Sequence, residues 1–211
     1  MALVLIYVDD MLITGNSILL IEETKNQLKQ AFKMKDLGEL RYFLGIEFGR
    51  SKQGILMHQR KYALELISET GLTAAKPAGT LIDTNLKLTT KQYDEETQMT
   101  KDDPLTDQGA YQRIVGKLLY LTMIRPDIFY GVQILSQFLQ QPKKPHMTTT
   151  LRIVRYVKNP LGQGLILSSY SKNTITAYCD ADWASFPLTK RLITGYFVQY
   201  GGSLVSWKSK K

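Results

Sequence analysis

Two adjacent carboxylates near the start of the chain are the first candidates for chemistry. Asp9 and Asp10 lie between the short apolar runs 3–8 and 11–13, and the turn residue Gly15 follows. Runs of this kind are typical of strands, so the pattern predicts a hairpin with an acidic tip. Neighbouring anions beside apolar strands are costly unless a cation offsets them, and Mg²⁺ prefers oxygen ligands. The pair is therefore a candidate magnesium site, and an acidic turn that only faces water is the alternative.

A further acidic group follows a later apolar strand. The predicted strand 174–179 runs into Asp180 and Asp182, so carboxylates again stand at the end of a strand. The one cysteine, Cys179, allows no internal disulfide and no cysteine-cluster zinc site, which fits a reducing, intracellular setting. His58 and His146 are far apart and lack metal-ligand spacing, and we interpret both as structural or surface residues.

Composition limits the class of protein. The chain has 211 residues, 44% of them hydrophobic, which is ordinary for a globular protein of one large domain or two small ones. Its 27 basic and 19 acidic residues leave a formal charge of +8, which favours polyanionic partners. No apolar run reaches membrane-spanning length, so the sequence predicts no membrane association.

Apolar periodicity predicts a mixture of helices and strands. Helical spacing predicts helices at 21–32, 61–69, 111–122, 128–139 and 147–158. Alternation predicts strands at 40–48, 55–58, 165–168, 174–179, 192–200 and 204–207.

Two segments have open interpretations. Residues 73–109 are polar with few apolar side chains, which is typical of a linker between modules or of a surface insertion. Arg152, Arg155 and Lys158 recur every three residues and share a helix face. That face either contacts solvent or contacts phosphates.

Five short motifs follow one another in a specific order along the chain. They are YVDD, MKDLGELRYFLGIEF, YQRIVGKLLYLTMIRPDIFYGVQILSQFLQQP, AYCDADWA and TGYFVQYGGSLVSWKSKK. Their order closely resembles the reverse transcriptase and ribonuclease H region of copia-type retrotransposon Pol polyproteins, over essentially the whole chain. The resemblance implies an α+β fold with a partial polymerase palm at 1–59. Thumb and connection helices follow at 60–160, with a linker at about 73–109, and a truncated ribonuclease H-like domain occupies 161–211.

The resemblance also implies roles for individual residues. Asp9 and Asp10 would hold the catalytic Mg²⁺ of a polymerase, and Asp180 would be the first metal carboxylate of a ribonuclease H site. The implied substrate-binding residues are Tyr7 and Lys35 near the nucleotide, Phe43, Leu44 and Gly45 in the hairpin that grips the primer, and Arg152, Arg155 and Lys158 on the template–primer backbone. The implied partners are an RNA template, RNA–DNA hybrid and deoxynucleoside triphosphates.

The same resemblance places a third palm aspartate and further ribonuclease H acids outside this sequence. We therefore expect weak Mg²⁺ binding and no independent polymerase activity. A non-catalytic RNA- or DNA-binding module derived from the element is the alternative, and a nuclease is a weaker one. Exposed strand edges favour self-association or pairing with the remaining Pol segments. The implied location is cytoplasmic or nuclear, within particle-like assemblies if the element is active.

Overall fold

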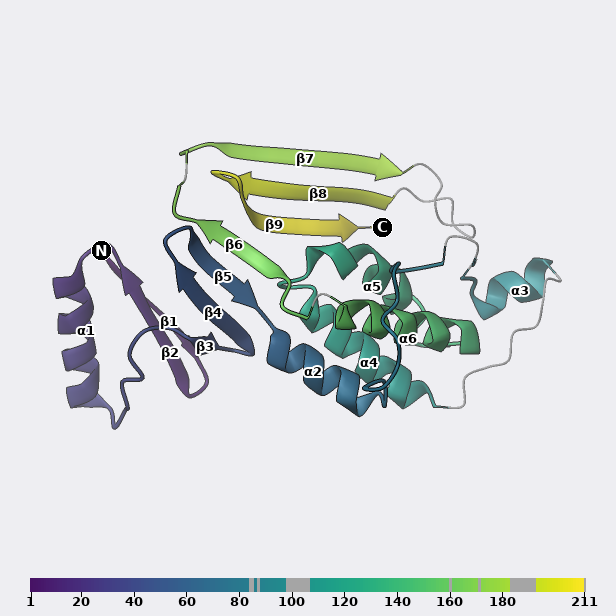
Figure 1. Cartoon of the computed structure of the whole chain (residues 1–211), viewed down its shortest axis with the longest axis horizontal. Helices are drawn as coiled ribbons and strands as arrows, with labels where there is room; N and C mark the ends of the chain where they lie inside the picture. Colours follow the sequence, from purple (N-terminus) through teal and green to yellow (C-terminus); the bar gives the residue numbers. More distant parts are fainter. Residues whose placement is uncertain are drawn as a thin grey trace. The chain divides into compact units, whose positions relative to one another are not determined.

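The computed structural model describes residues 1–83, 86, 88–97, 107–159, 161–170, 172–182 and 193–210. Across these residues the chain has six α-helices and three small antiparallel sheets, and the predicted α+β class is confirmed (Figure 1). The chain forms two compact units, residues 1–48 and 49–211, which we describe separately. The domain boundaries expected from the sequence stay a prediction.

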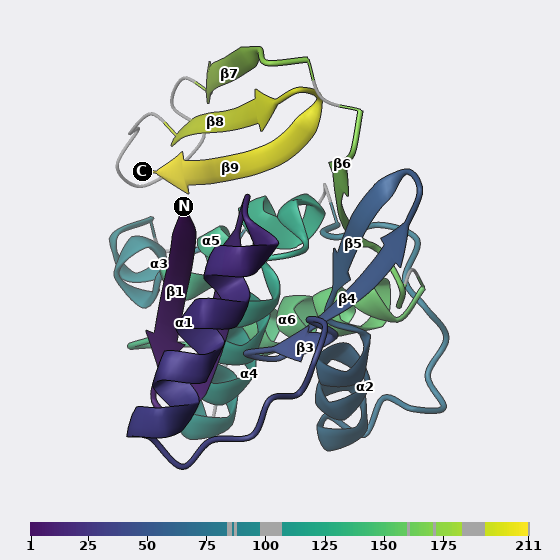
Figure 2. The same ribbon diagram turned by 90° about the vertical axis from the view of Figure 1, so that its left-hand side faces the viewer.

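The first unit is a hairpin beside a helix. Strands β1 (Ala2–Tyr7) and β2 (Asp10–Gly15) pair antiparallel, and helix α1 (Ile18–Ala31) lies along them (Figure 2). Residues 1–48 are all described, and none of them is fully buried. Even Ile18 and Leu19 of α1 remain 80% and 83% exposed. The hydrophobic effect therefore stabilises this unit only weakly.

The predicted strand 40–48 is wrong, because the chain reverses in its middle. Strand β3 (Tyr42–Phe43) pairs with β4 (Ile46–Ser51) across a two-residue turn, with Phe43 opposite Ile46. Leu44 and Gly45 have φ angles of 47° and 73°, the left-handed values that a tight hairpin turn requires. Alternating apolar residues continue through such a turn, so periodicity alone did not reveal the reversal.

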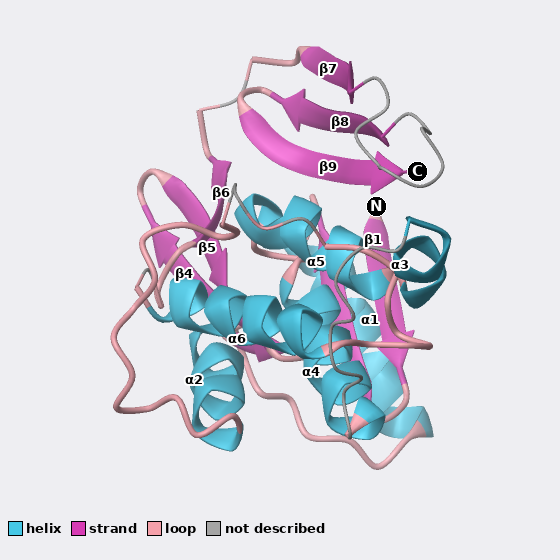
Figure 3. Cartoon of the chain, turned by 90° about the vertical axis from the view of Figure 1, so that its right-hand side faces the viewer, coloured by secondary structure: helices cyan, strands magenta, loops and turns pink. Residues whose placement is uncertain are grey.

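The second unit contains a helical core. Helices α2 (Arg60–Glu69), α4 (Gln108–Leu121), α5 (Phe129–Ser136) and α6 (Lys144–Lys158) pack together (Figure 3). The fully buried side chains at its centre are Leu66, Tyr111, Val115, Leu118, Leu121, Ile128, Val132, Leu135, Ile153, Val154 and Val157. The predicted helices are confirmed with one change. The segment expected as a helix at 128–139 starts as the 3-10 turn η1 (Pro126–Ile128), and α5 ends at Ser136.

The predicted C-terminal strands are confirmed with shifted ends. Strand β6 (Gly164–Ser168) pairs with β5 (Gly54–His58), in a sheet of order β3-β4-β5-β6. Strands β7 (Ile175–Asp182), β8 (Ile193–Tyr200) and β9 (Ser203–Lys210) form a separate antiparallel sheet in that order. The indole N–H of Trp207 in β9 donates to the carbonyl oxygen of Thr122 at 3.1 Å, which ties this sheet to the helical core.

The polar stretch after α2 runs along α6. We call its described residues 72–83, 86 and 88–97 the strap; it includes helix α3 (Lys91–Thr97). The Lys158 ammonium donates to the carbonyl oxygens of Leu72, Thr73 and Ala75 at 3.2, 2.5 and 2.6 Å. Further along, Arg152 donates to the Thr80 hydroxyl at 2.6 Å. Hydrogen bonds from charged donors are about twice as strong as neutral ones, so α6 holds the start of the strap firmly.

Replacing Lys158 with methionine should free the start of the strap. Lys158→Met keeps an unbranched apolar chain but removes the donor for three carbonyl groups. We expect a loss of about 2 kcal/mol in the free energy of unfolding and faster amide exchange over residues 72–78. Chemical denaturation and hydrogen-exchange mass spectrometry measure the two effects. Lys52→Met, at an exposed turn lysine, is the charge-matched control, and an equal loss in both variants would contradict the assignment.

Candidate functional site

The acidic tip predicted from the sequence is the turn of the β1–β2 hairpin. Tyr7 and Asp10 face each other as the last cross-strand pair, and Val8 and Asp9 form the turn between them. Tyr7, Asp9 and Asp10 are all exposed. The fold therefore brings these three predicted residues together at an exposed turn.

Backbone geometry at this tip carries strain. Val8 has a φ angle of 51°, in the left-handed region that β-branched residues rarely adopt. Its side chain is 80% exposed, so burial does not compensate for the strain. Strained turns of this kind persist where the surrounding structure holds them, and they are common at functional sites.

Asp9 and Asp10 offer carboxylate oxygens, which are the ligands that Mg²⁺ prefers, but two carboxylates are too few to hold the ion by themselves. Among the described residues, no group of three or more His, Cys, Asp or Glu side chains comes together that could hold a metal ion. Asp9 and Asp10 thus fit as two ligands of a site that needs others.

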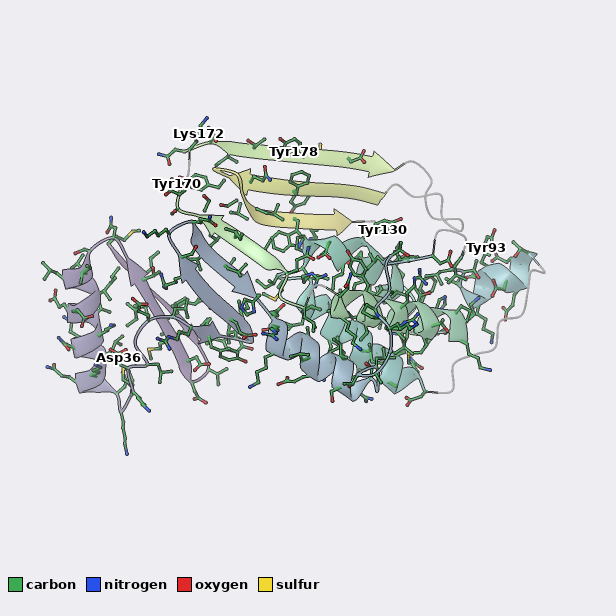
Figure 4. All side chains as sticks on the ribbon, viewed as in Figure 1. Asp36, Tyr93, Tyr130, Tyr170, Lys172 and Tyr178 are labelled. Atoms are coloured by element: carbon green, nitrogen blue, oxygen red, sulfur yellow. The ribbon has the colours of Figure 1, made fainter. Side chains whose placement is uncertain are left out.

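The other predicted substrate-binding residues of the first unit lie on two segments. Lys35 is exposed in the coil between α1 and β3, and Phe43, Leu44 and Gly45 form the tip of the β3–β4 hairpin. The coil is held by Asp36, which is labelled in Figure 4. The Gly38 N–H and the Lys29 ammonium both donate to the Asp36 carboxylate and hold its pKa below the usual value.

The three cations predicted to contact phosphate have different surroundings. Lys158 and Arg152 donate to the strap, as described above. The backbone carbonyl of Arg155 accepts from the Ala78 N–H at 3.2 Å, and within the described residues its guanidinium makes no hydrogen bond to the strap. The sequence did not reveal the strap contacts, because the partners are more than 70 residues apart.

Asp180 lies at the edge of an aromatic cavity of about 670 Å³ between α5 and the β7–β9 sheet. Tyr130 from α5 and Tyr178 from β7, both labelled in Figure 4, line it. Phe197 and Trp207 line it as well. The Tyr178 and Phe197 rings stack at 4.6 Å. Among the described lining residues, Asp180 is the one carboxylate. Sequence reasoning missed this cavity, because its aromatic residues come from α5 and from three strands that lie more than 35 residues further along the chain.

The β1–β2 and β3–β4 hairpins lie in a segment that matches a known protein family. Residues 1–84, which include both hairpins, match the family described as reverse transcriptase (RNA-dependent DNA polymerase). The retrovirus-related Pol polyprotein from transposon RE1 of Arabidopsis thaliana is 40% identical over 98% of this chain and 14% of its own length. That from transposon TNT 1-94 of Nicotiana tabacum is 33% identical over 99% of this chain and 16% of its own. An uncharacterized mitochondrial protein of Arabidopsis thaliana is 36% identical over 98% of this chain and 82% of its own length.

The chain belongs to the reverse transcriptase region of copia-type retrotransposon Pol polyproteins. The resemblance drawn from the five motifs is thereby confirmed. The chain spans about one seventh of the RE1 polyprotein, 14% of its length. No solved structure matches it. In the part of the chain that the structure describes, no helix is long and apolar enough to cross a membrane.

Relieving the strain at the reverse transcriptase hairpin should stabilise it. Asparagine tolerates left-handed φ angles better than valine, so Val8→Asn should add up to about 1 kcal/mol of local stability. Amide exchange of β1 and β2 measured by NMR should slow. Val4→Asn, the same substitution at a strand position of this hairpin, should speed exchange instead. Slower exchange in both variants, or in neither, would contradict strain at Val8.

Proposed function

We propose that this chain works in RNA-directed DNA synthesis as part of a copia-type reverse transcriptase. The observation that carries the proposal is the pair of exposed carboxylates, Asp9 and Asp10, at the tip of a tight hairpin in the segment that matches the family. In this proposal they supply two ligands for Mg²⁺, and other acidic residues of the polymerase complete the site. The isolated chain then binds Mg²⁺ weakly and does not extend a primer.

Neighbouring residues have supporting roles in the proposal. Tyr7, paired with Asp10, faces the incoming nucleotide or the primer end. Lys35 contributes a positive charge near the triphosphate, and the turn of Phe43, Leu44 and Gly45 contacts the primer. The reversal of the chain at Leu44 and Gly45 supports this last role, because a tight turn exposes its backbone to a bound strand.

The second unit is assigned to binding of RNA–DNA hybrid and to the start of a ribonuclease H-like domain. Its four packed helices correspond to the thumb and connection, and the antiparallel β7–β9 sheet with Asp180 on its first strand supports the ribonuclease H assignment. In this assignment Asp180 is a metal ligand of that second site. The protein acts inside the cell, where the RNA template is found.

Metal binding gives the most direct evidence for the hairpin site. Mn²⁺ is a paramagnetic substitute for Mg²⁺ and broadens the NMR signals of nearby amides. We expect broadening to be strongest at residues 7–11 and to decrease at least threefold in Asp9→Asn and Asp10→Asn. Asp36→Asn, at another carboxylate of the same unit, is the control. Equal broadening in all four proteins, or a maximum elsewhere, would overturn the assignment.

Primer extension on an RNA template with Mg²⁺ then tests whether this chain carries a complete polymerase metal site. The unmodified chain and Asp9→Asn should both leave the primer unextended, because two carboxylates cannot position two metal ions. Extension by the unmodified chain alone would show that the site is complete without further polymerase residues.

Hybrid binding distinguishes the phosphate-contact role from a structural one. Binding of RNA–DNA hybrid should weaken steeply with salt. Of the three predicted phosphate contacts, Arg155 is the one whose guanidinium does not bond the strap, so Arg155→Met should lower the salt slope by about one. Affinity that does not change with salt would exclude phosphate contact. Two results together would favour the non-catalytic binding module: hybrid binding that Asp9→Asn leaves unchanged, and no Mn²⁺ broadening at the β1–β2 hairpin. The net charge of +8 supports that role.

A further inference from the structure

Helix α6 begins in a buried polar cluster that includes the strap. The Lys143 ammonium donates to the Asp94 carboxylate at 2.5 Å and to the Thr89 hydroxyl at 2.9 Å. The Thr89 hydroxyl donates to the other Asp94 oxygen at 2.6 Å. The side chains of Lys143 and Asp94 are only 5% and 10% exposed. This cluster joins residues almost fifty positions apart and fixes the end of the strap that carries α3.

His146 completes the cluster and is fully buried. Its Nδ1 accepts a hydrogen bond from the Lys143 backbone N–H at 2.9 Å, so Nδ1 carries no hydrogen. Its Nε2 lies 3.1 Å from the Thr89 carbonyl oxygen, which can only accept, so Nε2 carries the hydrogen. The ring also stacks on Phe138, with 3.9 Å between the centroids. Both nitrogens are therefore used in the roles that a neutral imidazole alone can fill.

Adding a second proton to the His146 ring would be unfavourable in the closed cluster. The proton would have to enter at Nδ1, where it would face the Lys143 N–H. The new charge would lie near the Lys143 ammonium, and Asp94, the carboxylate that the described residues place in this cluster, already pairs with that ammonium. From α4 the ring faces Tyr111, which stays neutral because burial raises its pKa. Among the described residues the cluster pairs one ammonium with one carboxylate, and protonation of His146 would bury a further positive charge beside them.

Asp94 does not titrate in the same range. Burial raises the pKa of its carboxyl, but hydrogen bonds from Lys143 and Thr89 outweigh burial and hold the pKa below its ordinary value. Asp94 therefore stays ionised through mildly acidic pH, the range in which a solvent-exposed histidine changes charge.

We propose that His146 is an acid-sensitive latch, which holds residues 88–97 of the strap on α6 only while its imidazole is neutral. When the strap lifts, the ring meets water and takes up a proton near pH 6.5, about the value of a free histidine. The open state thus binds more protons than the closed state. Closure is favoured above about pH 6.5, and the closed-to-open ratio falls up to about tenfold for each unit below it. The inference does not depend on the proposed polymerase role.

Hydrogen exchange of the whole chain at pH 7.5, 6.5 and 5.5, corrected for the intrinsic pH dependence, tests the latch. Exchange over residues 88–97 should rise by about tenfold between pH 7.5 and 5.5, while the amides of α4 and α5 keep their protection. The rise should persist in His58→Gln, which changes the one other histidine of the chain. It should be absent in His146→Gln, whose amide does not titrate.

NMR of the imidazole nitrogens gives a readout that does not need a folded variant. At pH 7.5 the His146 ring should show the neutral form with the hydrogen on Nε2, and it should become doubly protonated only together with the rise in exchange. A doubly protonated ring at pH 7.5 would overturn the proposal. So would unchanged exchange in the unmodified protein, a pH step that survives in His146→Gln, or loss of protection in α4 and α5 at the same pH.

Discussion

Burial of helix α6 is the constraint on which the second unit depends. Ile153, Val154 and Val157 are fully buried against the other helices, and each such side chain contributes roughly 1.5–3 kcal/mol. The helix also buries two threonine hydroxyls that have hydrogen-bond partners. The hydroxyls of Thr149 and Thr150 donate to carbonyl oxygens one turn back along the helix. Because α6 is fixed in this way, its charged residues can hold the strap along its length.

The residues with recognisable polymerase chemistry lie outside that core. Asp9 and Asp10 belong to a unit in which all 48 residues are described and none is fully buried. Exposure is compatible with the metal-binding role proposed for these carboxylates, because burial without a partner would favour their neutral form. It also means that the geometry of the hairpin depends on local turn chemistry, including the strained Val8, more than on packing.

Part of the positive charge in this chain stabilises its own fold. A net charge of +8 suits a protein that handles nucleic acid, but Lys143, Arg152 and Lys158 donate to the chain's own oxygens. Carbonyl and hydroxyl groups of a polar segment need donors when they pack against a helix, and long cationic side chains supply several donors each. The basic face of α6 therefore stabilises the fold, and counts of basic residues overstate the surface that nucleic acid can contact.

The sequence by itself determined the family, the mixed α+β class, the helices and the acidic hairpin, because periodicity, turn residues and short motifs act over a few neighbouring positions. Its prediction of one strand over 40–48 was wrong, since a two-residue turn at Leu44 and Gly45 leaves the alternation intact. Only the tertiary structure decided that the polar segment after α2 packs on α6, and that His146 lies in a buried cluster with Asp94 and Thr89. Those contacts join residues about 50 to 85 positions apart, and such pairings depend on how whole helices pack, which no local pattern records.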